Sequence, residues 1–259
     1  MGRLSILASQ AVRTRLDRRT GAPQGVEPPA PGAEPSGRAD RSRPSAGVLE
    51  EIDRMVVHVV ALVGGEAIAG ATHALLACDR EAAKLLMVRD ELVDEQIAAI
   101  STLAQRQLVS GRTTESERAE LVMVLRMLPD LDRNGDLAEH VARLAARGLG
   151  AEMSPRSRGL VERMGEVASA IWASTADAFS ERSPQAGTVV DALDDEMDEL
   201  HVGLTAELAT GAMPVPVAIE LAMVGRFYER FGDHAVNLAR RMSAFTLGAG
   251  SEPPGPGAA

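Results

Sequence analysis

Apolar residues recur at three- and four-residue spacing from about Gly47 onward, and turn-forming residues divide this pattern into six segments. Such spacing predicts amphipathic helices rather than strands. Two of the segments follow a serine-proline pair, Ser154–Pro155 and Ser183–Pro184, in which an N-cap precedes a first-turn proline. The predicted helices span residues 48–75, 78–108, 114–147, 156–181, 184–210 and 214–245. The sequence therefore predicts an all-α fold.

The composition supports helices and narrows the kind of protein. Aromatic residues make up 2% of the 259 residues and hydrophobic residues 45%, a balance that suits helix packing better than a β-sandwich. The single cysteine, Cys78, excludes an internal disulfide framework and favours a reducing compartment; we expect it to be a small buried hydrophobic residue. The net charge of −10 argues against nucleic acid as a primary partner.

The most apolar stretch, residues 56–77, is the nearest candidate for a membrane span. A spanning helix needs about 20 predominantly apolar residues. The stretch is interrupted by His58, Gly64, Gly65, Glu66 and His73. We therefore expect a protein that reaches a membrane only through its partners.

The first 46 residues are rich in Pro, Gly, Ala, Ser and Arg, which predicts a disordered tail because little apolar surface can be buried. This segment holds eight arginines against four acidic residues, a balance of +4 that leaves −14 for the rest of the chain. Its opening, RLSILASQAVRTRLDRR, lacks the continuous apolar region of a signal peptide. We interpret the opening as a flexible arm or a mis-chosen start, with a short amphipathic helix as the alternative.

The chain contains an internal repeat. With a shift of 97 residues, LDRNGDLAEHVA at residues 131–142 aligns with YERFGDHAVNLA at residues 228–239. A second correspondence lies in the preceding helix of each half, where RDELVDEQI at residues 89–97 aligns with VDALDDEMD at residues 190–198 with a shift of 101 residues. The sequence therefore predicts two tandem copies of one structural unit.

The repeat sets the expected boundaries of the folded units. We predict two three-helix bundles, residues 47–150 and residues 151–247, stacked in one domain. Each bundle closes in antiparallel fashion because its connections are short. The tail of residues 1–46 precedes them, and residues 248–259 form a disordered C-terminus.

Each repeat carries polar residues at every fourth position of its third helix. Positions four apart advance only about 40° around a helix, so they share one face. These stripes are Asp132, Asp136 and His140 in the first half, and Glu229, Asp233 and Asn237 in the second. The preceding helices add the pairs Asp90/Asp94 and Asp191/Asp195. We expect these ten residues to form a metal-binding site in each half.

Like charges four apart repel on a helix, so the stripes have no structural benefit unless a cation or a basic group offsets them. An oxygen-rich cluster suits Mg²⁺, Mn²⁺, Ca²⁺ or iron, and His140 extends the choice toward iron or zinc. The alternative is a solvated acidic face that Arg133, Arg226 or Arg230 partly neutralises. Gly135 and Gly232 interrupt the same helices, and we expect each to allow close contact with a neighbouring helix.

Other candidate residues are expected to be structural. We predict that His234 packs or lies at the surface, and that Trp172, Phe227, Tyr228 and Phe231 are core or interface residues. His58, His73 and His201 have no partner motif. The sequence contains no nucleophile elbow, phosphate-binding glycine loop or His-Glu-x-x-His helix, which indicates a protein that is not an enzyme.

The stretches ERFGDHAVNLA and DRNGDLAEHVA, with the acidic helices before them, resemble the PhoU family of phosphate-response regulators over about residues 48–245. The resemblance implies a cytoplasmic, often dimeric protein of two three-helix bundles, with a divalent or trivalent metal ion such as Fe, Zn, Mg or Mn at the acidic motifs. It also implies a negative regulator that links a phosphate-specific ABC transporter to a sensor histidine kinase. Asn134 and His140 depart from the family pattern, which has a branched apolar residue and Asn there.

Two other functions fit the same residues. A metal-dependent enzyme would use the carboxylate clusters and would need an open coordination position and a nearby general base. A metal-free helical adaptor of another transporter or channel would use the helices only as binding surfaces. Stoichiometric metal in the purified protein separates the adaptor from the other two functions.

Overall fold

The computed structural model describes residues 45–181 and 186–249, and every element in these two ranges is helical. The all-α prediction is confirmed. The elements are α2 (Ser45–Ala61), the π-helical turn η1 (Leu62–Ala67), α3 (Ile68–Ala77), α4 (Arg80–Val109), α5 (Glu115–Arg147), the 3₁₀ turn η2 (Leu149–Glu152), α6 (Pro155–Glu181), α7 (Ala186–Ala209) and α8 (Val215–Ala249). Most of the predicted tail, the end of the C-terminus and the predicted start of the fifth helix at residue 184 lie outside the described residues.

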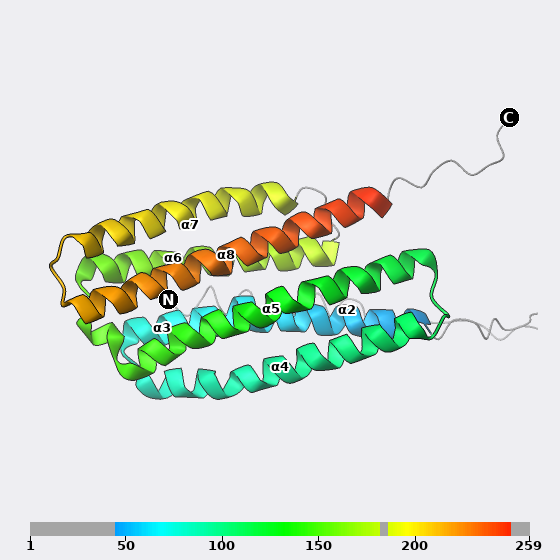
Figure 1. Ribbon diagram of the computed structural model, residues 1–259, viewed down its shortest axis with the longest axis horizontal. Coiled ribbons are helices and arrows are strands. Elements are labelled where there is room, and N and C mark those ends of the chain that lie inside the picture. The colour runs from blue at the N-terminus through cyan, green and yellow to red at the C-terminus, as the bar shows by residue number, and fades with distance from the viewer. Residues whose placement is uncertain (1–44, 182–185, 250–259) are drawn as a thin grey trace, which may run out of the picture.

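The helices form two three-helix units that lie side by side along the long axis of the molecule (Figure 1). The first unit consists of the α2–η1–α3 run with α4 and α5, and the second of α6, α7 and α8. The units meet where α5 packs against α8 and where α3 packs against α6. The predicted architecture of two repeated three-helix bundles in one domain is therefore confirmed.

The helix starts follow the local capping chemistry of the sequence. The side chain of Asp79 accepts a hydrogen bond of 2.9 Å from the backbone N–H of Ala82 at the start of α4. At α5, Thr114 and Glu117 cap each other's backbone N–H groups, at 3.2 Å and 2.7 Å. These caps satisfy backbone donors that an α-helix leaves free in its first turn. The predicted starts at residues 78 and 114 fall within two residues of the observed ones.

The first predicted helix contains a π-helical turn that periodicity did not reveal. The run from Ser45 to Ala77 is continuous, but residues Leu62–Ala67 form a π turn around Gly64. A Cβ placed on Gly64 would lie 2.3 Å from Cβ of Trp172 on α6. The wider turn and the missing side chain together admit this tryptophan at the contact between the two units.

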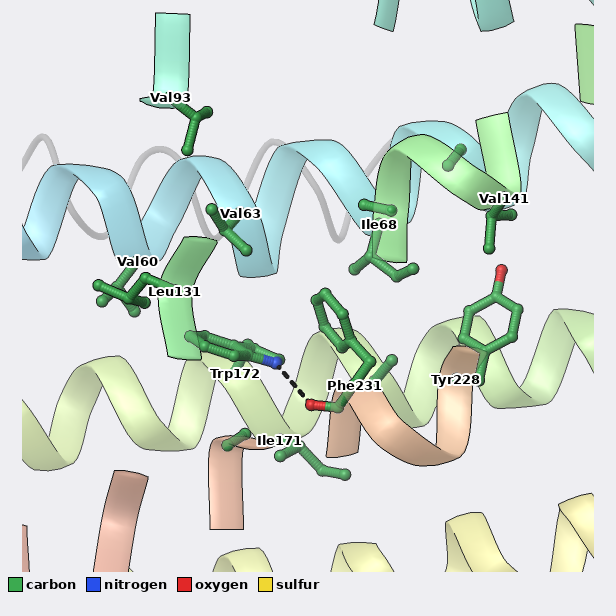
Figure 2. Packing of buried hydrophobic residues seen from close by; sticks show 14 of the residues in the cluster. Val60, Val63, Ile68, Val93, Leu131, Val141, Ile171, Trp172, Tyr228 and Phe231 are labelled. Carbon is green, nitrogen blue, oxygen red and sulfur yellow. Dashed lines mark hydrogen bonds between the residues drawn. The ribbon is translucent and has the colours of Figure 1, made fainter. Parts of the chain in front are cut away.

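One hydrophobic core extends through both units. Trp172, Tyr228 and Phe231 are fully buried in it, as expected for core residues. Figure 2 shows Trp172 donating a hydrogen bond of 3.3 Å from Nε1 to the backbone oxygen of Phe231. The hydroxyl oxygens of Tyr228 and Thr72 lie 2.6 Å apart and join α8 to α3. The two repeats are therefore coupled by buried contacts within one shared core.

The run of residues 47–77 is long and apolar enough to cross a membrane by length and composition alone. Its Val56, Val59, Val60 and Val63 are buried in the core, and the run packs against α6. A core helix of a soluble protein passes the same test. By composition, the run therefore remains a candidate membrane span despite its polar and glycine interruptions. Its packing, however, places it in the core of the protein.

Cys78 is exposed, and the expectation of a buried cysteine was wrong. The residue ends α3 in the left-handed conformation, with φ of 57°. Its backbone N–H caps the last turn of α3, so its place at the surface connection to α4 is set by the helix end.

Candidate metal-binding site

The two glycines of the repeated motif face carboxylates on the neighbouring helix. In the first unit, a Cβ on Gly135 of α5 would lie 2.9 Å from Oδ1 of Asp90 on α4. In the second unit, a Cβ on Gly232 of α8 would lie 3.1 Å from Oδ1 of Asp194 on α7. The expected close helix contact at these glycines is confirmed, and in each unit the group that comes close is an aspartate.

This pairing corrects the alignment of the acidic helices. Asp194 lies 104 residues after Asp90, whereas the sequence alignment used a shift of 101 and matched Asp90 with Asp191. The buried neighbours agree with the longer shift, because a Cβ on each of the same two glycines would lie 3.9 Å from Val93 and 3.8 Å from Met197, which are also 104 residues apart. The alignment was therefore wrong by three residues, slightly less than one turn of helix.

The predicted ligands of α7 are accordingly not the residues that face the glycine of the neighbouring helix. Asp191 is half-exposed, and its Oδ1 accepts a hydrogen bond of 3.0 Å from Arg240 on α8. Asp195 is exposed. The true counterparts of Asp90 and Asp94 are Asp194 and Asp198, which were not among the predicted ligands.

The carboxylates of the first unit act on one another electrostatically. Burial raises the pKa of Asp90 to about 6, and the repulsion of four other carboxylates adds to the effect of burial. Burial also raises the pKa of Asp94, with further contributions from Asp132 and Asp136 of α5. We call this group the first acidic cluster, and its members are Asp90, Asp94, Asp132, Asp136 and Glu139. The four predicted aspartates of the first half therefore lie in one cluster.

The second unit holds an equivalent cluster. Burial raises the pKa of Asp194 to about 6; Asp233, Asp198 and Asp191 raise it further, whereas Arg240 opposes them. The second acidic cluster consists of Asp191, Asp194, Asp198, Glu229 and Asp233. Both helix pairs, α4 with α5 and α7 with α8, thus collect negative charge around a glycine.

Glu229 contributes a carboxylate oxygen that lacks a donor. Its Oε1 accepts a hydrogen bond from Arg226, one turn earlier on α8. Its Oε2 is buried and has no hydrogen-bond partner among the described residues. Burial raises the pKa of this side chain, Asp233 adds to the rise, and Arg226 opposes it. A buried acceptor without a partner is costly, so this oxygen favours a cation or a proton donor.

The third member of each predicted stripe is placed at the edge of its helix pair. His140 stacks on Phe227 of α8, with ring centroids 5.3 Å apart and an interplanar angle of 25°. Asn237 is exposed on α8. His140 therefore packs at the contact between α5 and α8, and a ligand role for His140 and Asn237 stays a prediction.

A buried polar network between α5 and α8 was not predicted. Asp130 is buried, and its Oδ2 accepts a hydrogen bond of 2.5 Å from Arg241. Asn134, also buried, donates to the backbone oxygen of Asp130 at 2.8 Å, and its Oδ1 lies 3.3 Å from Nδ1 of His234. His234 thus packs, as expected, and it compensates the unusual Asn134. The missed signal was that Asp130 and Asn134 occupy core positions of the apolar pattern.

The donor atoms of the clusters fit a cation by chemistry and charge. Carboxylate oxygens are the ligands preferred by Mg²⁺, Ca²⁺ and Mn²⁺. Both clusters concentrate mutually repelling carboxylates, and Glu229 adds the unpartnered oxygen. Within residues 45–181 and 186–249, however, no three Asp, Glu, His or Cys side chains converge as a metal site. Sharing one ion would require these side chains to move.

Comparisons with known proteins agree with the division into two repeated three-helix units. The family described as "PhoU domain" matches residues 60–145 and 161–242, one match in each three-helix unit. The phosphate-specific transport system accessory protein PhoU homolog 1 of Mycobacterium tuberculosis H37Rv is 31% identical over 189 residues, which cover 72% of this chain and 86% of the relative. PhoU homolog 2 of the same strain is 32% identical over 195 residues, covering 72% and 89%.

Solved structures show the same fold. The crystal structure of PhoU from Pseudomonas aeruginosa has a TM-score of 0.72 at 25% identity, covering 78% of this chain and 99% of that one. The phosphate transport system regulatory protein PhoU from Streptococcus pneumoniae has a TM-score of 0.70 at 20% identity, covering 77% and 95%. These relatives are named as accessory or regulatory proteins and not as enzymes. With a family match in both units and relatives above 30% identity over most of its length, the chain belongs to the PhoU family.

Proposed function

We propose that this protein is an accessory regulator of phosphate transport that acts by binding partners and not by catalysis. The observation that carries the proposal is the duplicated pairing of an acidic helix with a glycine-containing helix, within two units that each match the PhoU domain. Relatives that are 31% and 32% identical to the chain are named phosphate-specific transport system accessory proteins. The partners we propose are a phosphate-specific ABC transporter and a sensor histidine kinase, which the protein couples as a negative regulator in the cytoplasm, as a homodimer.

The proposal includes a cation at the acidic clusters. In the first unit the residues that would hold it are Asp90, Asp94, Asp132 and Asp136, and in the second they are Asp194, Asp198, Glu229 and Asp233. A bound cation supplies positive charge that neutralises these carboxylates and draws the two helices of each pair together. The raised pKa values of Asp90 and Asp194 and the unpartnered Oε2 of Glu229 support a cation in both units.

Binding to the transporter and the kinase tests the proposal directly. The full-length protein is immobilised and exposed to the purified ATPase subunit of the phosphate transporter, and separately to the cytoplasmic part of the sensor kinase, both from the same organism. We expect saturable binding to each. Absence of binding to both, in the presence and absence of Mg²⁺ and Mn²⁺, contradicts the proposed function.

The cation is tested separately by calorimetric titration of Mg²⁺ and Mn²⁺ into chelator-treated protein. We expect Asp90→Asn/Asp194→Asn to weaken binding at least tenfold, because each substitution removes a charged oxygen donor. The matched control, Asp195→Asn/Glu199→Gln, removes two exposed acids of α7 outside the second acidic cluster and keeps wild-type affinity. Equal loss in both variants contradicts a site at the clusters and indicates only general attraction to a negative surface.

A further inference from the structure

An exposed apolar stripe runs along α4, on the side that faces away from the core. Leu85, Val88 and Leu92 are 66%, 65% and 56% exposed, although each is a large hydrophobic side chain. Their spacing of three and four residues places them on one face of the helix. Val93 and Ile97, on the opposite side, are buried in the core. We call Leu85, Val88 and Leu92 the α4 stripe.

The fold of the repeat does not require this stripe. With the shift of 104 residues that relates α4 to α7, its three positions correspond to Val189, Ala192 and Glu196. Glu196 instead accepts a hydrogen bond of 2.6 Å from Arg163 of α6. The second repeat keeps apolar residues at two of the three positions but interrupts the stripe with a charge at the third. A continuous stripe in only one repeat points to a role in binding, since exposed contiguous apolar residues are unfavourable on their own.

Negative charge borders the stripe. Two exposed acids, Glu91 and Glu95, lie beside its C-terminal end. The two neighbouring basic residues are already engaged, Lys84 with Glu81 at 2.8 Å and Arg89 with Glu66 at 3.5 Å. The surface therefore suits a segment that combines apolar side chains with positive charge.

The N-terminal segment of the same chain has this composition. Residues 3–19 carry five arginines and one aspartate, a balance of +4 against −14 for everything after the first 46 residues. Apolar residues recur in this segment at the spacing of one helix face, at Leu4, Leu7, Ala8 and Ala11. Four arginines follow them, at Arg13, Arg15, Arg18 and Arg19. We propose that residues 3–19 bind the α4 stripe of their own chain, with the arginines against its acidic border.

The connection between the two is long enough. Residues 20–44 join the segment to α2, which begins beside the end of α4 in Figure 1. The α4 stripe lies roughly 26–36 Å from that end, at 1.5 Å per residue from Val109 back to Leu92 and Leu85. A fully flexible linker of 25 residues has a root-mean-square span of about 25–30 Å, and a proline-rich one such as residues 20–44 reaches further. The stripe is therefore within reach of the segment of its own chain, and the short tether favours binding within one chain over binding between chains.

Hydrogen exchange of the full-length protein, read by mass spectrometry, tests the proposal. In the wild-type chain we expect amides of residues 3–19 to exchange at least tenfold more slowly than an unstructured peptide of the same sequence. The arm variant, Arg13→Gln/Arg15→Gln/Arg18→Gln/Arg19→Gln, loses this protection because it removes the charge. The stripe variant, Leu85→Ser/Val88→Ser/Leu92→Ser, loses this protection because the substitutions remove the apolar binding surface.

A control variant, Val189→Ser/Val202→Ser, changes two residues of α7 that are 56% and 69% exposed and keeps the protection of residues 3–19. Unchanged exchange in the core of α6 confirms that each variant is folded. Exchange of residues 3–19 at the unstructured rate in the wild-type chain overturns the proposal. Protection that rises with protein concentration assigns the stripe to a second copy, and protection that requires anionic lipid vesicles assigns the segment to a membrane; either result also overturns it.

Discussion

Replacing Asp194 by Asn is expected to stabilise the metal-free protein at neutral pH. The folded state raises the pKa of Asp194 from 3.8 to about 6, through burial and the repulsion of Asp233 and Asp198. The folded protein therefore binds the proton more tightly than the unfolded chain. Its stability falls as the pH rises from about 4 through 6, and above that range the charged carboxylate destabilises the fold.

The size of the effect follows from the pKa change. A difference of about two pKa units corresponds to roughly 3 kcal/mol without screening. Asp194 is only half-buried, so screening by solvent reduces this to about 1 kcal/mol. For a chain of this size, a gain of about 1 kcal/mol raises the midpoint of thermal unfolding by roughly 2–4 °C.

Thermal unfolding in the presence of a chelator, at pH 8 and pH 4, measures the effect. We expect Asp194→Asn to be more stable than wild type at pH 8 and to lose most of this advantage at pH 4, where the aspartate is protonated in the folded state. The control Asp195→Asn removes an exposed acid of α7 outside the second acidic cluster and is expected to be neutral. A gain that is independent of pH, or an equal gain in Asp195→Asn, refutes the reasoning.

Three further substitutions test the packing of the site and the core. Gly232→Ala places a Cβ 3.1 Å from the carboxylate of Asp194 on α7. We expect a stability within about 1 kcal/mol of wild type and weaker Mn²⁺ binding by calorimetry. Unchanged Mn²⁺ affinity contradicts this expectation. Gly64→Ala places a Cβ 2.3 Å from Cβ of Trp172 and is expected to cost at least 1–3 kcal/mol in urea unfolding; a neutral effect contradicts the contact. Arg241→Ala leaves buried Asp130 without its closest cation and is expected to cost on the order of 3 kcal/mol of stability. The double variant Asp130→Met/Arg241→Met is expected to lose less stability, because it leaves no buried charge unpaired. Equal losses in the two variants contradict an ion-pair origin.

The fold was largely predictable because its signals are local. Apolar residues recur at helical spacing along the long helices, and Asp79, Thr114 and Glu117 cap the starts of α4 and α5. The π turn at Gly64 was not predictable from periodicity, because it depends on Trp172 from a helix about 100 residues later. A pair of adjacent glycines in an apolar helix was the available signal.

The acidic clusters were predictable in kind but not in register. The run from Asp191 to Asp198 contains two aspartate pairs four residues apart, and the sequence alone does not say which pair faces α8. Burial of Met197 decides it, since that residue fixes which side of α7 enters the core and brings Asp194 to Gly232. Tertiary packing thus selects among patterns that are equivalent along the chain.

The contact between α5 and α8 carries the largest departure from the repeat. Asp130 of α5 corresponds to Phe227 of α8 at the shift of 97 residues, so one end of the contact holds the ion pair with Arg241 and the other the stack of His140 on Phe227. A repeat detected in sequence predicts equivalent positions, but Asp130 and Phe227 occupy equivalent positions and have different side chains and partners. The repeat alone therefore did not predict these contacts.

The central claim is that the protein represses the phosphate-starvation response through its partners. It is tested most directly in a deletion strain of its own organism. A reporter under a phosphate-starvation promoter is measured in phosphate-rich medium, with the deletion complemented by wild type, by Asp90→Asn/Asp194→Asn or by Asp195→Asn/Glu199→Gln. We expect the deletion to raise reporter expression, wild type and the Asp195/Glu199 control to restore repression, and the cluster variant to restore it only in part. Unchanged expression in the deletion strain contradicts the account.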